Sequence, residues 1–138
     1  MREDILVSLL EEVRKGSLDI KEALQKLRHL PFDDMGFAKI DNHREIRTGF
    51  PEVIFCPGKT PEQILAIVKR MNENGSNVLA SRMKKETAEF LSAHFPLGEY
   101  FDVAGIFYVE NKPLVMNSKT VLVLSAGTSD ISVAEEAA

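Results

Sequence analysis

Residues 51–63 decide the fold class, and they read Pro-Glu-Val-Ile-Phe-Cys-Pro-Gly-Lys-Thr-Pro-Glu-Gln. The run Glu52 to Cys56, apolar after its first residue and bounded by two prolines, predicts a short strand. Thr60 can cap a helix, Pro61 suits the first helical position, and the glutamine three residues after the cap completes a capping box. The stretch therefore predicts a strand that leads into a helix, the repeating unit of an α/β fold.

The alternation of strands and helices continues downstream. In order, the pattern predicts a helix from Pro61 that ends at Asn74-Gly75, a strand at residues 77–80, a helix at residues 84–94 and a strand at residues 100–109. Phe37–Ile40 predicts a further short strand upstream. This order favours parallel pairing with right-handed crossovers. The sequence therefore predicts a small βαβαβ domain over residues 33–116.

A helical hairpin is expected at the start of the chain. Apolar residues repeat there with helical spacing, at Ile5, Leu6, Leu9, Leu10 and Val13. Gly16 is expected to end the first helix because it can adopt positive φ, and Ser17 is expected to cap a second helix that ends before Pro31. The predicted hairpin occupies residues 1–32. Its apolar stripe needs a cover, either from this domain or from a partner subunit.

A third unit is expected at residues 117–138, after the break at Asn111-Lys112-Pro113. Val121–Leu124 has the all-apolar composition of a strand that is covered on both faces. A loop of small residues follows, and then a helical start at residues 133–138. A strand of this type normally lies among further parallel strands, so we expect the chain to be truncated within this unit.

Composition and charge exclude several classes of protein. The 138 residues are 44% apolar, which is enough for a core, and their net charge of −4 argues against nucleic acid as a partner. A single cysteine excludes an internal disulfide. No apolar run approaches the roughly 18 residues that a membrane span needs, and the start of the chain lacks a secretory signal. We therefore expect a cytoplasmic protein with no membrane partner.

The loop Gly127-Thr128-Ser129-Asp130 is the first candidate site. Ligands of open α/β sheets bind at the carboxyl ends of strands, and this turn offers backbone N–H groups, two hydroxyls and a helix end to a phosphate or carboxylate. Asp130 could hold a ribose hydroxyl or orient a donor. The alternative is that Ser129 or Asp130 is only the N-cap of the helix.

Two resemblances to known families follow. Val121–Leu124, the Gly-Thr-Ser-Asp turn and the Ala-Glu-Glu-Ala segment resemble the opening of the PurE-type aminoimidazole ribonucleotide carboxylase domain. Residues 41–55 (Asp-Asn-His-Arg-Glu-Ile-Arg-Thr-Gly-Phe-Pro-Glu-Val-Ile-Phe), Gly58-Lys59-Thr60-Pro61 and the late Ser-Ala-Gly-Thr-Ser-Asp loop resemble LarB, the nickel-pincer cofactor biosynthesis family. The resemblance to LarB runs over essentially the whole chain.

The LarB resemblance implies a carboxylase and hydrolase that acts on nicotinic acid adenine dinucleotide. With CO₂ as co-substrate, carboxylation at C5 of the pyridinium ring and phosphoanhydride cleavage would give pyridinium-3,5-biscarboxylic acid mononucleotide and AMP. A pyridinium ring is electron-poor, so a nucleophile must add first and create an enamine-like carbon. In the family this nucleophile is a cysteine of the PurE-like domain, at a position beyond Ala138. We therefore expect no catalytic residue in this chain and no activity from it alone.

The resemblance also implies a fold and partners for residues 117–138. They would form the first strand, loop and helix of a PurE-like, flavodoxin-like domain of three α/β layers, with Gly127, Thr128, Ser129 and Asp130 as its substrate-binding loop. PurE-like cores assemble into homo-oligomers, so a homo-oligomer that binds a dinucleotide substrate is expected. No tightly bound cofactor is expected, and the sequence leaves open whether Mg²⁺ assists phosphoanhydride cleavage.

Three basic residues are further candidates for substrate binding. Arg44 and Arg47 stand three apart beside a turn at Thr48-Gly49, so both can reach the phosphates of a dinucleotide if the segment is helical. The alternative is that they are surface residues paired with nearby carboxylates. Lys59 follows Gly58 just before a helix, where an anion is favoured. The first glycine of a Walker phosphate loop is absent, which argues against a nucleoside triphosphate site.

The cysteine and the histidines give little indication of a catalytic or metal-binding role. Cys56 ends an apolar strand with no base assigned to it, and a lone cysteine of this kind is usually a small hydrophobic residue. His29, His43 and His94 are dispersed, so no metal site is expected. Two other functions stay open: carboxyaminoimidazole ribonucleotide mutase activity of purine biosynthesis, and a noncatalytic binding or assembly module that uses the helical hairpin.

Overall fold

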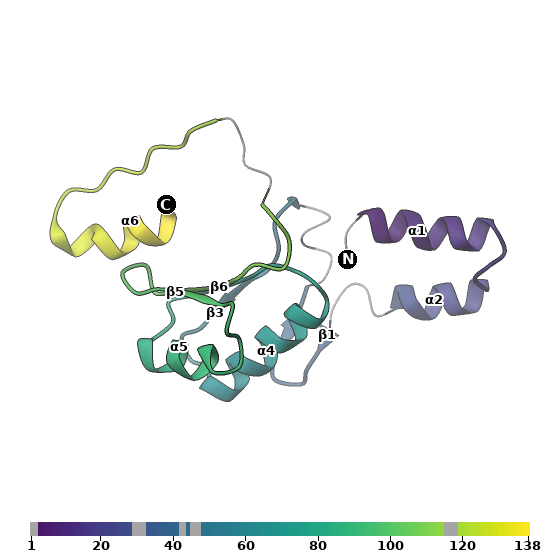
Figure 1. Cartoon of the computed structure of the whole chain (residues 1–138), viewed down its shortest axis with the longest axis horizontal. Helices are drawn as coiled ribbons and strands as arrows, with labels where there is room; N and C mark the ends of the chain where they lie inside the picture. The colour runs from purple at the N-terminus through teal and green to yellow at the C-terminus, as the bar shows by residue number, and fades with distance from the viewer. Residues whose placement is uncertain (1–2, 29–32, 42–43, 45–47, 115–118) are drawn as a thin grey trace. The chain divides into compact units, whose positions relative to one another are not determined.

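The computed structural model describes residues 3–28, 33–41, 44, 48–114 and 119–138, and within them it is a mixed α/β protein. These residues form five α-helices and two sheets, and the chain divides into two compact units, Met1–Glu52 and Val53–Ala138 (Figure 1). The boundaries expected from the sequence, near residues 32 and 116, remain a prediction. None of the described helices is long and apolar enough to cross a membrane.

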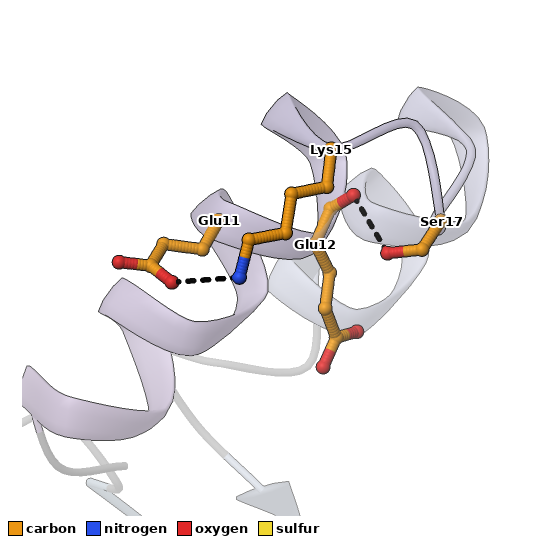
Figure 2. A network of polar contacts seen from close by, with 4 residues as sticks. All are labelled: Glu11, Glu12, Lys15 and Ser17. Atoms are coloured by element: carbon orange, nitrogen blue, oxygen red, sulfur yellow. Dashed lines mark hydrogen bonds and ion pairs between the residues drawn. The ribbon is translucent and has the colours of Figure 1, made fainter.

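The first unit begins with two helices in contact, α1 (Glu3–Arg14) and α2 (Ile20–Arg28). Gly16 has φ of +72° and ends α1, as the sequence predicts. The prediction that Ser17 caps α2 is wrong, because its hydroxyl donates to the carbonyl of Glu12 at 3.0 Å and so closes α1 (Figure 2). Asp19 takes the capping role, since its carboxylate accepts a hydrogen bond from the backbone N–H of Lys21 at 3.2 Å.

The rest of the first unit contains a small antiparallel ribbon of β1 (Asp33–Asp34) and β2 (Lys39–Ile40). The predicted strand Phe37–Ile40 is thus present only in its last two residues. Asp34 accepts the N–H of Gly36 at 2.9 Å, which stabilises the turn between the strands. Pro31, His29, His43 and Arg47 lie outside the described residues, so the predicted end of the second helix stays a prediction.

The second unit is built on a four-stranded sheet in the order β3-β4-β6-β5. Its elements, in chain order, are β3 (Val53–Phe55), α4 (Pro61–Glu73), β4 (Val78–Ser81), α5 (Lys85–Ser92), β5 (Glu99–Phe101) and β6 (Ile106–Val109). β3 and β4 are parallel neighbours, as predicted. β6 runs antiparallel to both β4 and β5, so the prediction of parallel pairing throughout is wrong.

The antiparallel half arises because the predicted strand at residues 100–109 is a hairpin. The chain turns between Phe101 and Ile106, where the N–H of Gly105 donates to the carbonyl of Asp102 at 3.3 Å and Gly105 has φ of +62°. Aspartate at the first position and glycine at the fourth suit a tight turn. Val103 and Ala104 in the turn are apolar, so the sequence pattern of the segment is that of one continuous strand.

The predicted start of α4 is confirmed in atomic detail. The hydroxyl of Thr60 accepts the N–H of Gln63 at 3.3 Å, and the Gln63 side chain accepts the N–H of Thr60 at 2.9 Å, which completes the capping box. At the other end, Gly75 has φ of +67° and closes the helix, as predicted. The buried residues of α4 share one face and are Ile64, Ile67, Val68 and Met71.

The core of the second unit lies between the sheet and the pair α4 and α5, which lie together on one face (Figure 1). One row of register partners, Ile54, Ala80 and Phe107, is buried there. A side chain at Gly98 would collide with the ring of Phe107, so glycine is required at that position. The opposite face stays partly open, and Phe55 on it is 51% exposed. Strands buried on one face only are typical of such two-layer packing.

The end of the chain forms a 3₁₀ turn, η1 (Thr128–Asp130), and a short helix, α6 (Ile131–Ala137). The prediction of a strand at Val121–Leu124 is wrong for this structure, since these residues pair with no strand and Leu122 is 76% exposed. An apolar strand of this kind is stable only when other strands and helices cover it, and the described residues provide no such neighbours. α6 begins two residues earlier than predicted.

Candidate functional site

The carboxyl ends of β3 and β4 meet at one edge of the sheet. The two strands are parallel, with Phe55 opposite Ser81, and the ladder continues one step further because the N–H of Cys56 donates to the carbonyl of Ser81 at 3.1 Å. The loop after β3 leads into α4, and the loop after β4 leads into α5. Ligands of α/β proteins bind at this type of edge, which makes the two loops the first place to look for a site.

Lys59 lies in the first of these loops, as the sequence predicts. Its ammonium group donates to the backbone carbonyl of Phe55 at 2.6 Å, and its N–H donates to the carbonyl of Cys56 at 3.1 Å. Gly58 has φ of +81° and allows this tight return. The side chain of Lys59 is half-buried. The loop thus holds a positive charge against the end of β3.

Arg82 lies in the second loop and was not among the predicted site residues. Its φ of +52° makes it the one non-glycine residue with positive φ among those the structure describes. Its guanidinium lies 5.8 Å from the centroid of the Phe55 ring, and its Nε lies 3.4 Å from the carboxylate of Glu136. A strained backbone at the end of a strand is a common mark of a functional position. The sequence signal was its place two residues after the predicted strand at residues 77–80.

Neighbouring residues fix the backbone beside Arg82 on both sides. The N–H of Met83 donates to the carbonyl of Gly105 at 2.8 Å, and its carbonyl accepts the hydroxyl of Tyr100 at 3.1 Å. The hairpin of β5 and β6 therefore determines the conformation of the loop after β4. The pKa of Tyr100 is raised, first because burial disfavours its charged form and then because Asp102 and Glu86 are negative, so it remains a hydrogen-bond donor.

Cys56 lies next to Lys59 but is poorly suited to act as a nucleophile. The residue is only 5% exposed, and its Sγ lies 3.9 Å from the carbonyl oxygen of Ile54. Burial raises the pKa of the thiol to about 11, and the positive charge of Lys59 offsets this only in part. The thiol therefore stays protonated near neutral pH, which agrees with the interpretation of Cys56 as a small hydrophobic residue.

The predicted substrate loop, Gly127 to Asp130, is exposed throughout. Gly127 has φ of +108° and its carbonyl accepts the N–H of Asp130 at 3.3 Å, while the Ser129 hydroxyl lies 3.4 Å from the Asp130 carboxylate. Asp130 occupies the N-cap position of α6 but makes no capping hydrogen bond with its side chain. The loop therefore leaves the hydroxyl of Thr128 and the side chains after it accessible, and their binding role remains a proposal.

The remaining candidates are more scattered. Arg44 is exposed, with its N–H 3.4 Å from the carbonyl of Asp41 and its own carbonyl accepting the hydroxyl of Thr48 at 2.8 Å. It belongs to the first unit, and Lys59 belongs to the second. Nδ1 of His94 lies 3.1 Å from the carbonyl of Phe90. In the part of the chain that the structure describes, no group of three histidine, cysteine or acidic residues could hold a metal ion.

A cavity of about 630 Å³ lies on the open face of the sheet. It is mainly apolar and is lined by Leu79, Phe101, Asp102, Val103, Ala104, Ile106, Tyr108, Leu114, Glu135 and Ala138. The Tyr108 hydroxyl is buried, with no hydrogen-bond partner among the described residues. Its pKa is raised, first by burial and then by the negative charge of Glu110. The acidic residues in the lining make this cavity unsuitable for phosphates.

Comparison with known proteins identifies the family. The family model described as the LarB/PurE-like N-terminal domain matches residues 32–112, which is more than half of the chain. The chain belongs to this family. Lys59 and Arg82 lie within the residues that the family model matches, and the loop from Gly127 to Asp130 lies outside them. The predicted LarB resemblance is thereby confirmed.

A curated relative extends the comparison over nearly the whole chain. An uncharacterized protein of Methanocaldococcus jannaschii is 30% identical over 142 residues, covering 96% of this chain and 54% of the relative. The chain thus spans about half the length of the curated relative that it matches. The LarB/PurE-like N-terminal domain of this chain therefore corresponds to part of a longer protein in that archaeon.

Proposed function

We propose that this chain is part of a LarB-type carboxylase and hydrolase that converts nicotinic acid adenine dinucleotide and CO₂ to pyridinium-3,5-biscarboxylic acid mononucleotide and AMP. The observation that carries the proposal is the family match over residues 32–112. It includes the segment Gly58-Lys59-Thr60-Pro61, which lies at the carboxyl edge of the parallel pair β3 and β4. We further propose a cytoplasmic location and assembly into homo-oligomers through a PurE-like core.

The proposed reaction needs a nucleophile that adds to the electron-poor pyridinium ring. The adduct carries electron density to C5, C5 bonds to CO₂, the C5 proton leaves, and expulsion of the nucleophile restores the aromatic ring. Cys56 does not meet this need, because it is buried and its pKa is about 11. We propose that the nucleophile comes from the PurE-like domain, and that this chain contributes substrate-binding residues, with Gly127, Thr128, Ser129 and Asp130 in the loop.

Hydrolysis of the phosphoanhydride is the second half of the proposed reaction. Water adds to one phosphorus atom, and the bond between that atom and the bridging oxygen breaks, which releases AMP. Positive charges near the two phosphates stabilise this step because negative charge builds up on the leaving phosphate oxygen. Lys59 is proposed to bind the phosphates, and Arg44 and Arg47 are separate candidates for the same role. Mg²⁺ is a proposed aid, and its contribution is measured by adding a chelator.

Calorimetric titration of the 138-residue chain with nicotinic acid adenine dinucleotide tests the binding role. Binding that Ser129→Ala and Asp130→Ala each weaken by about tenfold would support the proposed loop, since each removes a polar contact to substrate. Ser125→Ala, in the same exposed segment, is the matched control and should leave the affinity unchanged. Carboxyaminoimidazole ribonucleotide is titrated in parallel, and tighter binding of that ligand would favour the purine mutase function.

Turnover is tested on the chain extended to the length of its relative. Incubation with nicotinic acid adenine dinucleotide and labelled bicarbonate should give labelled mononucleotide and AMP in equal amounts. The 138-residue chain alone should give neither product. If the extended protein binds no dinucleotide and forms no AMP, the proposed function is wrong.

A noncatalytic assembly role is the second candidate, and the helical hairpin favours it. α1 and α2 keep large apolar side chains exposed, namely Ile5, Val7, Leu10, Ile20 and Leu24. Such a surface is typical of a contact between proteins. If the hairpin mediates self-association, Leu10→Glu with Leu24→Glu should convert an oligomer to a monomer in light scattering. Leu9 is unsuitable for this test because it is buried, so a charge there would disrupt the hairpin itself.

A further inference from the structure

Two positive side chains from different loops converge on one aromatic residue. The ammonium of Lys59 lies against the backbone carbonyl of Phe55, and the guanidinium of Arg82 lies 5.8 Å from the centroid of its ring. Phe55 is the last residue of β3, and its ring is half exposed on the open face of the sheet. A planar apolar surface and two cations therefore occur together at the carboxyl edge of the parallel pair.

A carboxylate of the chain already occupies part of this place. Glu136 of α6 lies 3.4 Å from Nε of Arg82, and its side chain is only 25% exposed. The arrangement shows that an anion can reach Arg82 beside Phe55. An ion pair with this degree of exposure is weak, since solvent screens it and both side chains lose freedom. A ligand with more negative charge than one carboxylate can displace it.

The N-terminus of α4, which follows Lys59 in the chain, does not supply free donors for an anionic ligand. At the start of α4, Thr60 caps the N–H of Gln63, and the pKa of Glu62 is lowered because its carboxylate accepts hydrogen bonds from its own N–H and from Thr60. Those donors are already used by the chain itself. The positive charge that can bind an anion here is carried by the side chains of Lys59 and Arg82.

We propose that Phe55, Lys59 and Arg82 form a binding site for the phosphoanhydride of a dinucleotide, with one aromatic ring of the ligand stacked on Phe55. The inference rests on the proposed function and names binding residues for it. A guanidinium fork binds two phosphate oxygens at once and keeps its charge at any physiological pH. Glu136 occupies Arg82 when no ligand is present, and the phosphates replace it.

The backbone of Arg82 fits this role. Positive φ at a non-glycine residue costs free energy, and the two hydrogen bonds of Met83 to Gly105 and Tyr100 hold it in place. The guanidinium of Arg82 lies 5.8 Å from the centroid of the Phe55 ring, at the end of β3. Glycine at this position would remove the guanidinium and relieve the strain, so Arg82→Gly should fold at least as well as the parent chain.

Titration of the whole 138-residue chain with inorganic pyrophosphate tests the site without the rings of the dinucleotide. Arg82→Gly and Lys59→Ala should each weaken binding about tenfold, because each removes a charged hydrogen-bond donor. Glu136→Gln should strengthen it about threefold by removing the competing carboxylate. Lys69→Ala, an exposed lysine on α4, removes the same charge elsewhere and should change the affinity less than about twofold.

A second titration with nicotinic acid adenine dinucleotide tests the stacked ring. Phe55→Leu keeps an apolar side chain but removes the aromatic ring, so it should weaken dinucleotide binding more than pyrophosphate binding, by about fivefold or more. Equal effects on the two ligands would overturn the stacking part of the proposal.

The outcomes separate this inference from the proposed function. Pyrophosphate binding that depends on Arg82 and Lys59 supports the anion site even if the extended protein turns over no dinucleotide. Dinucleotide turnover by the extended protein, combined with pyrophosphate affinity that is the same in the parent, Arg82→Gly and Lys69→Ala chains, overturns the site and leaves the proposed function standing. Absence of pyrophosphate binding by the parent and by Glu136→Gln would also overturn it.

Discussion

Two segments of the second unit have the same sequence pattern, and only one of them forms the structure that the pattern predicts. In each, an apolar run is followed by a loop with glycine and then by a helix. Val53–Phe55 forms β3 and pairs with β4, whereas Val121–Leu124 is exposed and pairs with nothing among the described residues. The comparison shows that an apolar run becomes a strand through its neighbours, because an unpaired strand buries little and leaves its backbone unsatisfied.

The helices that follow show the same contrast. α4 has thirteen residues, a capping box and a buried face of four residues. α6 has seven residues, no side-chain cap and no buried residue. Short helices are marginal unless tertiary packing supports them, so the stability of α4 depends on its contact with the sheet.

The largest expected effect comes from truncating the buried aromatic residue of the sheet to which β3 belongs. Phe107→Ala should lower the free energy of unfolding by about 3–5 kcal/mol, because Phe107 is fully buried and its loss leaves a cavity. Leu122→Ala should change it by less than about 0.5 kcal/mol, because Leu122 is already exposed. Urea unfolding followed by circular dichroism measures both. Similar losses in the two variants would show that the end of the chain is packed in solution.

An intermediate effect is expected from the cysteine at the end of β3. Its pKa of about 11 lies above the ordinary value of 9.0, so the folded state favours the protonated thiol. The resulting stabilisation is fully present below pH 9 and is lost as the pH rises through 11, by about 2 kcal/mol. Unfolding measured between pH 8 and pH 11 should therefore show a steeper decline for the parent than for Cys56→Ala.

Thiol reactivity sharpens the same comparison. Ser125 follows the exposed run as Cys56 follows β3. In the double variant Cys56→Ala with Ser125→Cys, alkylation by iodoacetamide at pH 8 should be at least about tenfold faster than alkylation of the parent chain. Equal rates would mean that β3 opens often enough to expose Cys56.

The smallest expected effect concerns the two helix caps. Thr60→Ala should destabilise the chain by about 1 kcal/mol, since it removes the acceptor for the N–H of Gln63. Asp130→Ala should cost less than about 0.5 kcal/mol because its side chain makes no capping bond. Thermal unfolding of the two variants checks the difference. A cost at Asp130 as large as that at Thr60 would contradict the description of α6 as uncapped.

Sequence reasoning succeeded where the signal is local and chemical. The capping box at Thr60, the glycine ends at Gly16 and Gly75, and the strand before Cys56 all follow from a few adjacent residues. The position of Lys59 in the loop before α4 follows from the same local signal, and its binding role stays a prediction. Sequence reasoning failed where the structure depends on residues distant in the chain. Periodicity alone cannot distinguish one strand at residues 100–109 from a hairpin with an apolar turn at Val103.

The candidate site was found only in part for the same physical reason. Arg82 contacts Phe55 through the pairing of β3 with β4, and its conformation depends on Gly105 in a later hairpin. Neither contact is visible in the residues around position 82. Ser17 shows the local version of the problem: two capping roles were open to it, and the presence of Asp19 two residues later decided between them.

β3 is an edge strand, and its short length has a consequence for how the protein behaves at high concentration. It has three residues, it lies at one end of the strand order, and Pro51 and Pro57 lie on either side of it. Proline cannot donate a hydrogen bond to a neighbouring strand, so a strand of another molecule could pair with only a few residues at this edge. The prolines that mark this strand in the sequence therefore also protect the folded protein against aggregation by edge-to-edge pairing.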